Sequence, residues 1–411
     1  MEKPRSLRLF HSLRHRPFAL LWSGQTISRV GDQLYQIALI WWVLQKTGSA
    51  SSIATLLICS FTPMLLFLLI GGVAVDRYSR VKIMFLSDLG RGALVIGVAF
   101  LASSDLLRLW HLYVASLLFG FVDAFFQPAY TAAVPAMTPP EALPSANSLT
   151  SLSQQLGRIV GPPLGAVMMG LVGIPAAFAL NGISFLIAAG CLVPLLRSSA
   201  PTASSTEPQR SGVWRDLREG FDTVRASPWL WITIGILAIS NVTLSGPYSV
   251  ALPVLVKQDL HTGVGTLGFL YAMFPIGYAV AAVWLGSAAK LRRRGLTIYW
   301  GLIVAGLMLL VFGLPVSVYG LAIAAILNGL ALELAGLSWT NLLQEQIPGE
   351  KLGRVSSIDS LGSFALLPVG YGITGCAVDW LGAPLAFLIG GGLTAALAAL
   401  ALMHPAIRRL D

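Results

Sequence analysis

The chain has 411 residues, of which 55% are hydrophobic and only 11% are charged, and its formal net charge is +9. Soluble globular proteins are about 25% charged, so this composition excludes a water-soluble surface and predicts a membrane protein. All three cysteines lie inside apolar segments, which favours neither a disulfide framework nor a metal site. We therefore expect neither a metal ion nor a cofactor.

The chain begins with a basic segment, residues 1–17. This segment has no apolar core of signal-peptide length and no small-residue cleavage site. We interpret it as a cytoplasmic N-terminal tail.

Apolar segments long enough to cross a bilayer follow, since a spanning helix takes about 20 apolar residues. The twelve predicted spans are residues 18–44, 51–75, 82–103, 109–137, 144–170, 173–197, 228–256, 264–289, 295–315, 317–345, 354–379 and 382–404. The sequence thus predicts an all-α membrane protein with one six-helix bundle over 18–197 and a second over 228–404. Residues 405–411 form a predicted cytoplasmic C-terminal tail.

The connection over residues 198–227 is longer than the others. Its first half is rich in Ser, Thr and Pro, and its second half places Trp214, Leu217, Phe221 and Val224 on one helical face. An apolar stripe opposite charged residues suits a helix lying in the membrane interface, and a solvated linker helix is the alternative. We expect a cytoplasmic linker that contains this amphipathic helix.

Lys and Arg residues are distributed asymmetrically over the connections. If the N-terminus is cytoplasmic, the connections on the opposite side hold only Lys46, Arg108 and Lys257. Cytoplasmic loops carry the excess of Lys and Arg, so both termini are predicted to be cytoplasmic, with the chain in the cell membrane. The basic residues then face lipid headgroups and the cytoplasm, and we expect no nucleic-acid partner.

The two halves of the chain repeat each other. Residues 139–148 (PPEALPSANS) align with 348–357 (PGEKLGRVSS), and GGVAVDRYSR at 71–80 has a weaker counterpart at 286–295. Six plus six helices around a linker is the pattern of transporters built from parallel repeats, with the substrate path between the halves.

The connection after the second predicted span carries a family signature. The pattern Gly72-x-x-x-Asp76-Arg77-x-x-Arg80-x-Lys82 resembles the loop motif of the major facilitator superfamily. The resemblance implies gating roles for Gly72, Asp76, Arg77 and Arg80, with Arg354 of the other half as the neighbour of Asp76. We expect Gly72 to allow close helix approach and Asp76 to meet a helix N-terminus or an arginine.

The fifth predicted span resembles a second motif of the same superfamily. Its pattern Gly157-x-x-x-Gly161-Pro162-x-x-Gly165 is similar to the motif associated with antiporters, with Ala166 where a closing glycine is usual. Glycines admit close helix approach and Pro162 frees a backbone carbonyl. Gly157, Gly161 and Pro162 are therefore gating candidates, and ordinary tight packing would explain the glycines as well.

The resemblance covers the whole chain and narrows to one branch. SRVGDQ in the first span, FFQPAYTAAVP in the fourth and LREGFDTVRASPWL before the seventh are similar to the branch that contains macrolide-efflux proteins and the enterobactin exporter. This implies a monomeric, proton-coupled exporter of amphipathic drug-like compounds or metabolites that works by alternating access. The alternatives are a transporter of one endogenous substrate, such as a siderophore or lysolipid, and a non-transporting membrane sensor.

Neither ATP-driven nor enzymatic function is expected. The sequence contains no G-x-x-x-x-G-K-[ST] phosphate-binding loop and no G-x-S-x-G nucleophile elbow. A proton gradient is the energy source that the resemblance implies.

Charged residues within the spans need an explanation, because each costs about 2.5–3.5 kcal/mol at mid-membrane. In the first span Gln25, Arg29, Asp32 and Gln36 share one helical face. Asp32 is either a titrating carboxylate that faces the substrate or the structural partner of Arg29 or of another helix.

The fourth span contains Asp123, followed on the same face by Gln127 and Tyr130. Asp123 either lies near the cavity or pairs with an arginine such as Arg158. In related drug antiporters the fourth span usually carries an arginine tied to proton transfer, and this chain has none there.

The third and tenth spans contain further charges. Asp88 and Arg91 lie one turn apart, and we interpret them as a structural pair. Glu333 has no basic residue nearby in sequence, so we expect either a proton-coupling role or a neutral, hydrogen-bonded acid.

The candidate substrate-binding residues lie on spans that line the central path in this superfamily. They are Trp22, Gln25, Arg29, Gln36, Gln127, Tyr130, Asn241, Tyr248, Tyr271, Tyr278, Trp339 and Asn341. Several could instead be packing residues, as aromatic stripes commonly are. If they do face the path, the cavity is large, aromatic and weakly acidic, and it suits amphipathic or cationic molecules.

Overall fold

The computed structural model describes residues 10–196, 213–287 and 294–408. All regular structure in these residues is helical, and ten helical stretches are long and apolar enough to cross a membrane. Two further long helices, α2 (Arg16–Thr47) and α6 (Leu143–Leu171), fall outside these ten. The structure confirms the predicted all-α membrane fold, and polar residues on α2 and α6 become important for the site.

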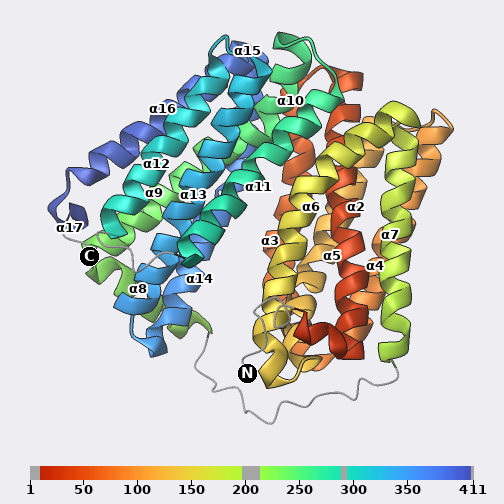
Figure 1. Cartoon of the computed structure of the whole chain (residues 1–411), viewed down its shortest axis with the longest axis horizontal. Helices are drawn as coiled ribbons and strands as arrows, with labels where there is room; N and C mark the ends of the chain where they lie inside the picture. The colour runs from red at the N-terminus through yellow and green to blue at the C-terminus, as the bar shows by residue number, and fades with distance from the viewer. Residues whose placement is uncertain (1–9, 197–212, 288–293, 409–411) are drawn as a thin grey trace. The chain divides into compact units, whose positions relative to one another are not determined.

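Contacts divide the chain into two units (Figure 1). Besides α2 and α6, the helices of the first unit are α3 (Ala50–Arg77), α4 (Arg80–Ser103), α5 (Leu109–Ala136) and α7 (Ile174–Leu196), preceded by the short η1 (His11–Arg14) and with η2 (Pro140–Ala142) before α6. Residues Thr47–Ala54, which include the first turn of α3, group with the second unit.

The second unit contains the remaining helices. They are α8 (Val213–Ala226), α9 (Pro228–Gly246), η3 (Pro247–Ala251), α10 (Leu252–Val254), η4 (Leu255–Asp259), α11 (Val264–Ser287), α12 (Arg294–Leu310), η5 (Val311–Gly313), α13 (Val318–Gln346), α14 (Gly349–Ala365), α15 (Leu367–Leu381), α16 (Ala383–Leu402) and α17 (Pro405–Arg408). α9 continues without a break through the π-helical turns η3 and η4, so that one stretch covers Pro228–Asp259.

One pair of glycine contacts recurs in both units. Gly92 of α4 lies against Gly182 of α7, and Gly306 of α12 lies against Gly391 of α16. A Cβ atom at any of these four positions would press against the opposite helix. The third and sixth long helices of each unit therefore pack in the same way, as a repeated bundle requires.

A second recurring contact joins the second and fourth long helices of each unit. Gly71 of α3 lies against the backbone of Ala124 in α5, and Gly277 of α11 lies against the backbone of Ile326 in α13. The expectation that Gly72 supplies this close approach is wrong, because a Cβ there would meet open space. Only the first of the two adjacent glycines faces α5.

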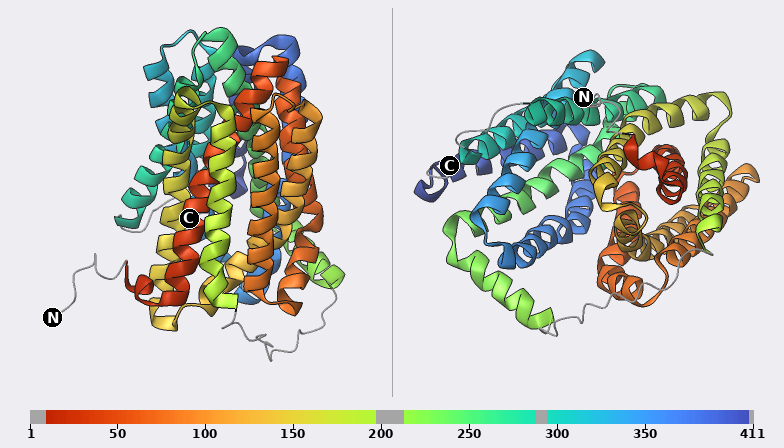
Figure 2. Two further views of the ribbon diagram at one scale, coloured as in Figure 1. Left: turned by 90° about the vertical axis from the view of Figure 1, so that its right-hand side faces the viewer. Right: turned by 60° about the horizontal axis from the view of Figure 1, so that its bottom comes forward.

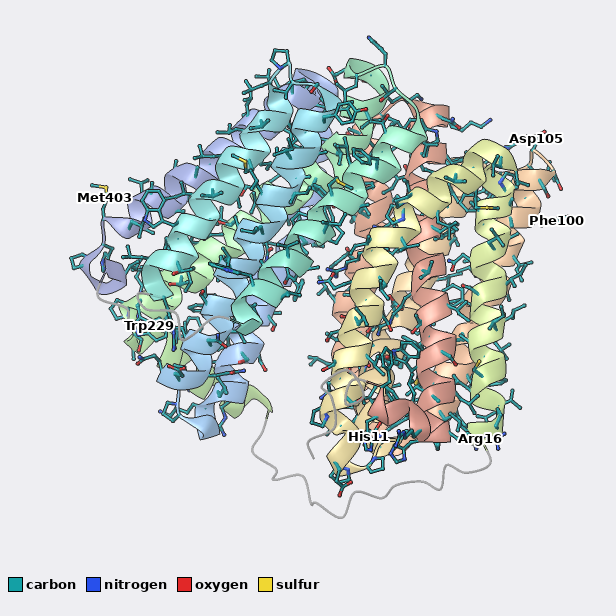
Figure 3. The ribbon with its side chains drawn as sticks, viewed as in Figure 1. His11, Arg16, Phe100, Asp105, Trp229 and Met403 are labelled. Atoms are coloured by element: carbon teal, nitrogen blue, oxygen red, sulfur yellow. The ribbon has the colours of Figure 1, made fainter. Side chains whose placement is uncertain are left out.

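Each unit has its own apolar core, built around buried residues such as Phe18 and Met84 in the first and Tyr299 and Leu342 in the second. Large apolar side chains are also exposed on the outer faces, among them Leu66, Leu69, Phe100, Ile183 and Val283. Figure 2 shows helices of the first unit side by side, and Figure 3 places Phe100 on its outside. Extensive apolar exposure of this kind marks a surface that contacts lipid.

The predicted amphipathic helix of the linker is present as α8, but its apolar residues do not share one environment. Val224 is buried in the core of the second unit, whereas Phe221 is 57% exposed. Gly220 lies against Arg354 and Ile358, so α8 packs on α14. The side chains of Trp214 and Leu217 fall outside the described residues.

A carboxylate from α15 caps the N-terminus of α3. Asp379 accepts hydrogen bonds from the backbone nitrogens of Ala50 (2.7 Å) and Ser51 (3.0 Å) and from the hydroxyl of Ser49 (2.8 Å). The first N–H groups of a helix have no partner within the helix, and a negative charge there is favourable. Gly375, one turn earlier in α15, lies against Ala50, Ser51 and Ala54 in the first turn of α3.

We predict that Asp379→Ala lowers the free energy of unfolding by about 1 kcal/mol, the usual cost of losing a helix cap. Thermal unfolding of the purified protein in detergent would measure the change, with Asp222→Ala, an exposed carboxylate of α8, as the matched control. Asp379→Asn keeps an acceptor and should fall between the two. Equal midpoints for Asp379→Ala and Asp222→Ala would contradict the prediction.

Candidate functional site

A cavity of about 450 Å³ lies within the first unit, walled by α2, α3, α5 and α6. Its polar wall consists of Arg29, Asp32, Gln33, Gln36, Ser60, Ser116, Asp123, Gln127, Gln154 and Arg158. Its apolar wall consists of Leu39, Leu56, Leu57 and Phe119, with Tyr35 beside them. Polar residues of α2 and α6 thus line the same cavity.

The polar stripe predicted on α2 is divided between two environments. Arg29, Asp32 and Gln36 line the cavity. Gln25 is buried and does not line it, because its amide nitrogen donates a hydrogen bond to Asp88 at 2.8 Å. Three of the four stripe residues are therefore available to a substrate in this cavity.

Arg91 of α4 is the centre of a buried ionic cluster. Its Nη2 lies 2.6 Å from Oδ1 of Asp88 and its Nη1 lies 2.9 Å from Oδ1 of Asp123. The side chain of Asp88 is fully buried, whereas that of Asp123 is 23% exposed. Arg91 therefore holds Asp123 from behind while this carboxylate forms part of the cavity wall.

Aromatic rings complete the surroundings of Arg91. The guanidinium lies over the rings of Phe126 (4.0 Å), Phe185 (4.5 Å) and Phe119 (5.6 Å). Cation–π contact stabilises a desolvated cation, so helices α5 and α7 both help to bury this charge.

The ion pairs differ from those that the sequence suggested. Of the two alternatives for Asp123, the place on the cavity wall is confirmed, and the arginine that pairs with it is Arg91 and not Arg158. Asp32 accepts a hydrogen bond from Asn181 of α7 at 3.4 Å, and no ion pair joins it to Arg29 in the described part of the chain. Arg91 belongs to the third span, and sequence spacing alone did not indicate that it reaches α5.

The glycine pattern of α6 packs against the cavity-lining part of α2. Gly157 lies against the backbone of Arg29, and Gly161 lies against Gln33 and the backbone of Val30. The helices are therefore close where α2 carries Arg29, and Arg158 next to Gly157 is brought to the same cavity. Pro162 is buried in this helix.

In the second unit, the predicted aromatic residues Tyr248 of η3 and Tyr271 of α11 contact one another. The hydroxyl of Tyr248 donates to the backbone oxygen of Tyr271 at 3.3 Å, and the hydroxyl of Tyr271 donates to that of Tyr248 at 3.4 Å. Tyr248 lies in the π-helical turn η3, and such turns are frequent at functional sites. Phe274 packs against Tyr248 with ring centroids 5.3 Å apart.

Glu333 of α13 is buried and is hydrogen-bonded to Tyr278 of α11. The sequence showed no partner because these residues belong to different helices. Tyr278 and Glu333 are thus brought together.

Several predicted binding residues are engaged in helix contacts outside the 450 Å³ cavity. Trp22 donates its indole N–H to the backbone oxygen of Leu149 (3.1 Å), and Trp339 donates to Oδ2 of Asp359 (3.1 Å). Asn241 donates to the backbone oxygen of Ser363 at 3.4 Å. Asn341 is exposed, and Tyr130 is buried with the guanidinium of Arg29 4.7 Å above its ring.

The residues of the loop signature border a separate cavity of about 870 Å³ in the first unit. Arg14, Arg16, Asp76, Arg77 and Arg80 line it, and Arg80 donates to the backbone oxygen of Ala132 at 3.1 Å. Figure 3 shows Arg16 and His11 at one end of this unit and Asp105 at the other. Of the weaker counterpart at 286–295, most residues fall outside the described chain, and Arg294 forms an ion pair with Glu345.

The sequence profile of the Major Facilitator Superfamily matches residues 21–247 and, a second time, residues 234–409. The chain belongs to this superfamily. It is therefore a multi-pass membrane transporter, and the resemblance drawn from its loop motif is confirmed.

Two similar proteins belong to the branch that the sequence motifs indicated. Macrolide efflux protein A of Streptococcus pyogenes is 26% identical over 402 residues, which cover 96% of this chain and 97% of that relative. Enterobactin exporter EntS of Citrobacter koseri is 28% identical over 349 residues, which cover 84% of this chain and 81% of the exporter.

Among solved structures, a bacterial homologue of the iron transporter ferroportin in an inward-facing state has the same fold, with a TM-score of 0.73 at 16% identity. The match covers 94% of this chain and 98% of that structure. A POT family transporter is similar to the same degree, with a TM-score of 0.74 at 13% identity and coverage of 94% and 96%.

We predict that Arg91→Gln lowers the free energy of unfolding by about 3–5 kcal/mol, because it leaves two carboxylates buried without their cation. Arg77→Gln removes an exposed arginine and is the control. Thermal or denaturant unfolding in detergent would measure both. A double-mutant cycle with Asp123→Asn should recover part of the loss, and an Arg91→Gln variant as stable as Arg77→Gln would contradict the cluster's structural role.

Proposed function

We propose that this protein is a proton-coupled exporter of amphipathic small molecules that works by alternating access. The observation that carries the proposal is the cavity of the first unit, where Asp32 and Asp123 face a space large enough for a drug-sized ligand. The efflux names of its relatives support export. Intramembrane carboxylates beside such a space are functional candidates by default.

The arrangement around Arg91 allows one carboxylate to change its charge while the rest stays in place. Protonation of Asp123 would remove one of the two negative charges that contact Arg91, and Asp88 would still hold the guanidinium. Gln25 would in turn still hold Asp88. A proton on Asp123 would therefore alter the cavity wall without releasing the buried arginine.

Asp32 and Glu333 are the other two candidate proton carriers. Asp32 lies on the cavity wall beside Asn181, and Glu333 lies in the second unit beside Tyr278. One charge moved through 100 mV provides about 2.3 kcal/mol, which corresponds to a roughly fifty-fold concentration gradient at about 1.4 kcal/mol per decade.

Topology and gating complete the proposal. Both termini and the linker at 198–227 are cytoplasmic, which is supported by the excess of Lys and Arg in those segments. The protein acts as a monomer. The loop residues Asp76, Arg77 and Arg80, together with Arg354 and the α6 residues Gly157, Gly161 and Pro162, take part in switching between conformations.

We predict that at least one of Asp32→Asn, Asp123→Asn and Glu333→Gln makes transport insensitive to an imposed pH gradient. Each amide has nearly the shape of the acid but cannot take up and release the proton. The measurement is uptake of a fluorescent amphipathic dye by vesicles containing purified protein, with Asp222→Asn as control. If all three variants respond to the gradient as the wild type does, the proton sites are assigned wrongly.

We predict that Asp76→Asn slows conformational switching and leaves ligand binding nearly unchanged, because Asp76 does not line the 450 Å³ cavity. Equilibrium binding in detergent and the transport rate in vesicles separate the two effects. A variant that loses affinity, or that transports at the wild-type rate, would remove this residue from the gating mechanism.

Transport of one defined endogenous molecule is the second candidate function, and the match to an enterobactin exporter favours it. A thermal-stability screen distinguishes the two. Stabilisation by many unrelated lipophilic compounds indicates a multidrug exporter, whereas a single tight ligand, such as a siderophore or lysolipid, indicates a dedicated transporter.

A further inference from the structure

We propose that the cavity of the first unit recognises an oxyanion of its substrate, a carboxylate or a phosphate, between Arg29 and Arg158. The inference rests on the proposed transport function and names the substrate class of the same site. The substrate is then an amphipathic anion.

The cavity wall carries both positive and negative side chains. Four charged side chains line it, Arg29, Asp32, Asp123 and Arg158. Asp123 is in an ion pair with Arg91, a residue behind the wall that also contacts Asp88, and Asp32 accepts a hydrogen bond from Asn181. Both carboxylates are thus engaged by groups behind the wall.

Unlike the two carboxylates, the two arginines have no such partner behind the wall among the residues that the structure describes. In the described residues neither Arg29 nor Arg158 has a carboxylate oxygen within the 4.0 Å of an ion pair. Arg29 lies 4.7 Å above the ring of Tyr130, and Arg158 is exposed. The N–H donors of both guanidinium groups are therefore available to a ligand in this cavity.

The two cations interact electrostatically across the cavity wall. The guanidinium of Arg29 lies within electrostatic range of Arg158 as well as of Asp32. Gly157 brings α6 against the backbone of α2 at Arg29, and Arg158 is the next residue of α6. Two like charges facing one space repel each other, and an anion between them removes this repulsion.

The guanidinium and amide groups of the cavity wall are hydrogen-bond donors that suit an oxyanion. Guanidinium presents a rigid fork of N–H donors that matches carboxylate and phosphate oxygens. The amides of Gln36, Gln127 and Gln154 on the same wall can donate further hydrogen bonds. The leucines and Phe119 of the wall suit the apolar part of an amphipath.

This assignment differs from the expectation of a weakly acidic cavity suited to cations. The structure shows that Asp123 is in an ion pair and that Glu333 is not a lining residue of the cavity.

A matched set of ligands tests the inference. Naphthalene-2-carboxylate and 2-naphthyl phosphate carry the oxyanion, naphthalene-2-carboxamide is neutral, and 2-naphthylmethylamine is cationic. Equilibrium dialysis with the purified wild-type protein should show that at least one anion binds about tenfold or more tightly than the carboxamide, as charge-assisted hydrogen bonds require. The preferred anion identifies the oxyanion as carboxylate or phosphate.

Variants locate the binding to the two arginines. Arg29→Gln and Arg158→Gln should each reduce anion binding about tenfold and leave carboxamide binding unchanged, while Arg158→Lys retains part of the anion affinity. Arg225→Gln, which removes an exposed arginine of α8, is the control, and thermal unfolding shows that each variant is folded.

Three results would overturn the inference: no binding of either anion, tightest binding of the amine, or anion binding that ignores both arginines. Because binding is measured without a pH gradient, none of these three results decides whether transport is coupled to protons. Conversely, anion binding without coupled transport would refute the coupling alone.

Discussion

The packing of the first unit depends on the buried ion pairs of the Arg91 guanidinium. It contacts carboxylates from its own helix and from α5, and three phenylalanine rings surround it. A buried ion pair gains little over apolar packing, but removing one member is costly because the other charge stays buried. The cluster therefore fixes α4 against α5, and Gln25 extends this constraint to α2 through Asp88. The cluster thereby also sets the position of the Asp123 carboxylate on the cavity wall.

Small residues make this arrangement possible. Glycines at equivalent helices of both units bring backbones into contact, at Gly92 with Gly182 and at Gly306 with Gly391. In a bilayer, where lipid tails are as apolar as leucine, close packing and hydrogen bonds replace the hydrophobic effect as the force between helices. The apolar exteriors are left to face lipid, and α2 and α6 can carry polar groups because several of these groups line the cavity.

Much of this could be predicted from the sequence, because helix length, apolar composition and repeated motifs are local properties. The all-α fold, the long helices and the shared face of Arg29, Asp32 and Gln36 are of this kind. Partners were not predictable, since Asp123 meets Arg91 only through the packing of α4 on α5, and Glu333 meets Tyr278 only through that of α13 on α11. The error at Gly72 has the same cause, because one residue along a helix turns the side chain by about 100° and changes which neighbour it meets.

The charge of the substrate bears on which carboxylate exchanges its proton. An anion and a proton bring opposite charges into one cavity, so each would favour the binding of the other, and by linkage the effect is reciprocal. Asp32 and Asp123 would then retain their protons while an anion is bound between Arg29 and Arg158, whereas an exchanger must release its proton as substrate binds. Glu333 is not a lining residue of this cavity and is free of that constraint. An anionic substrate therefore assigns the exchanged proton to Glu333, and a cationic substrate assigns it to Asp32 or Asp123.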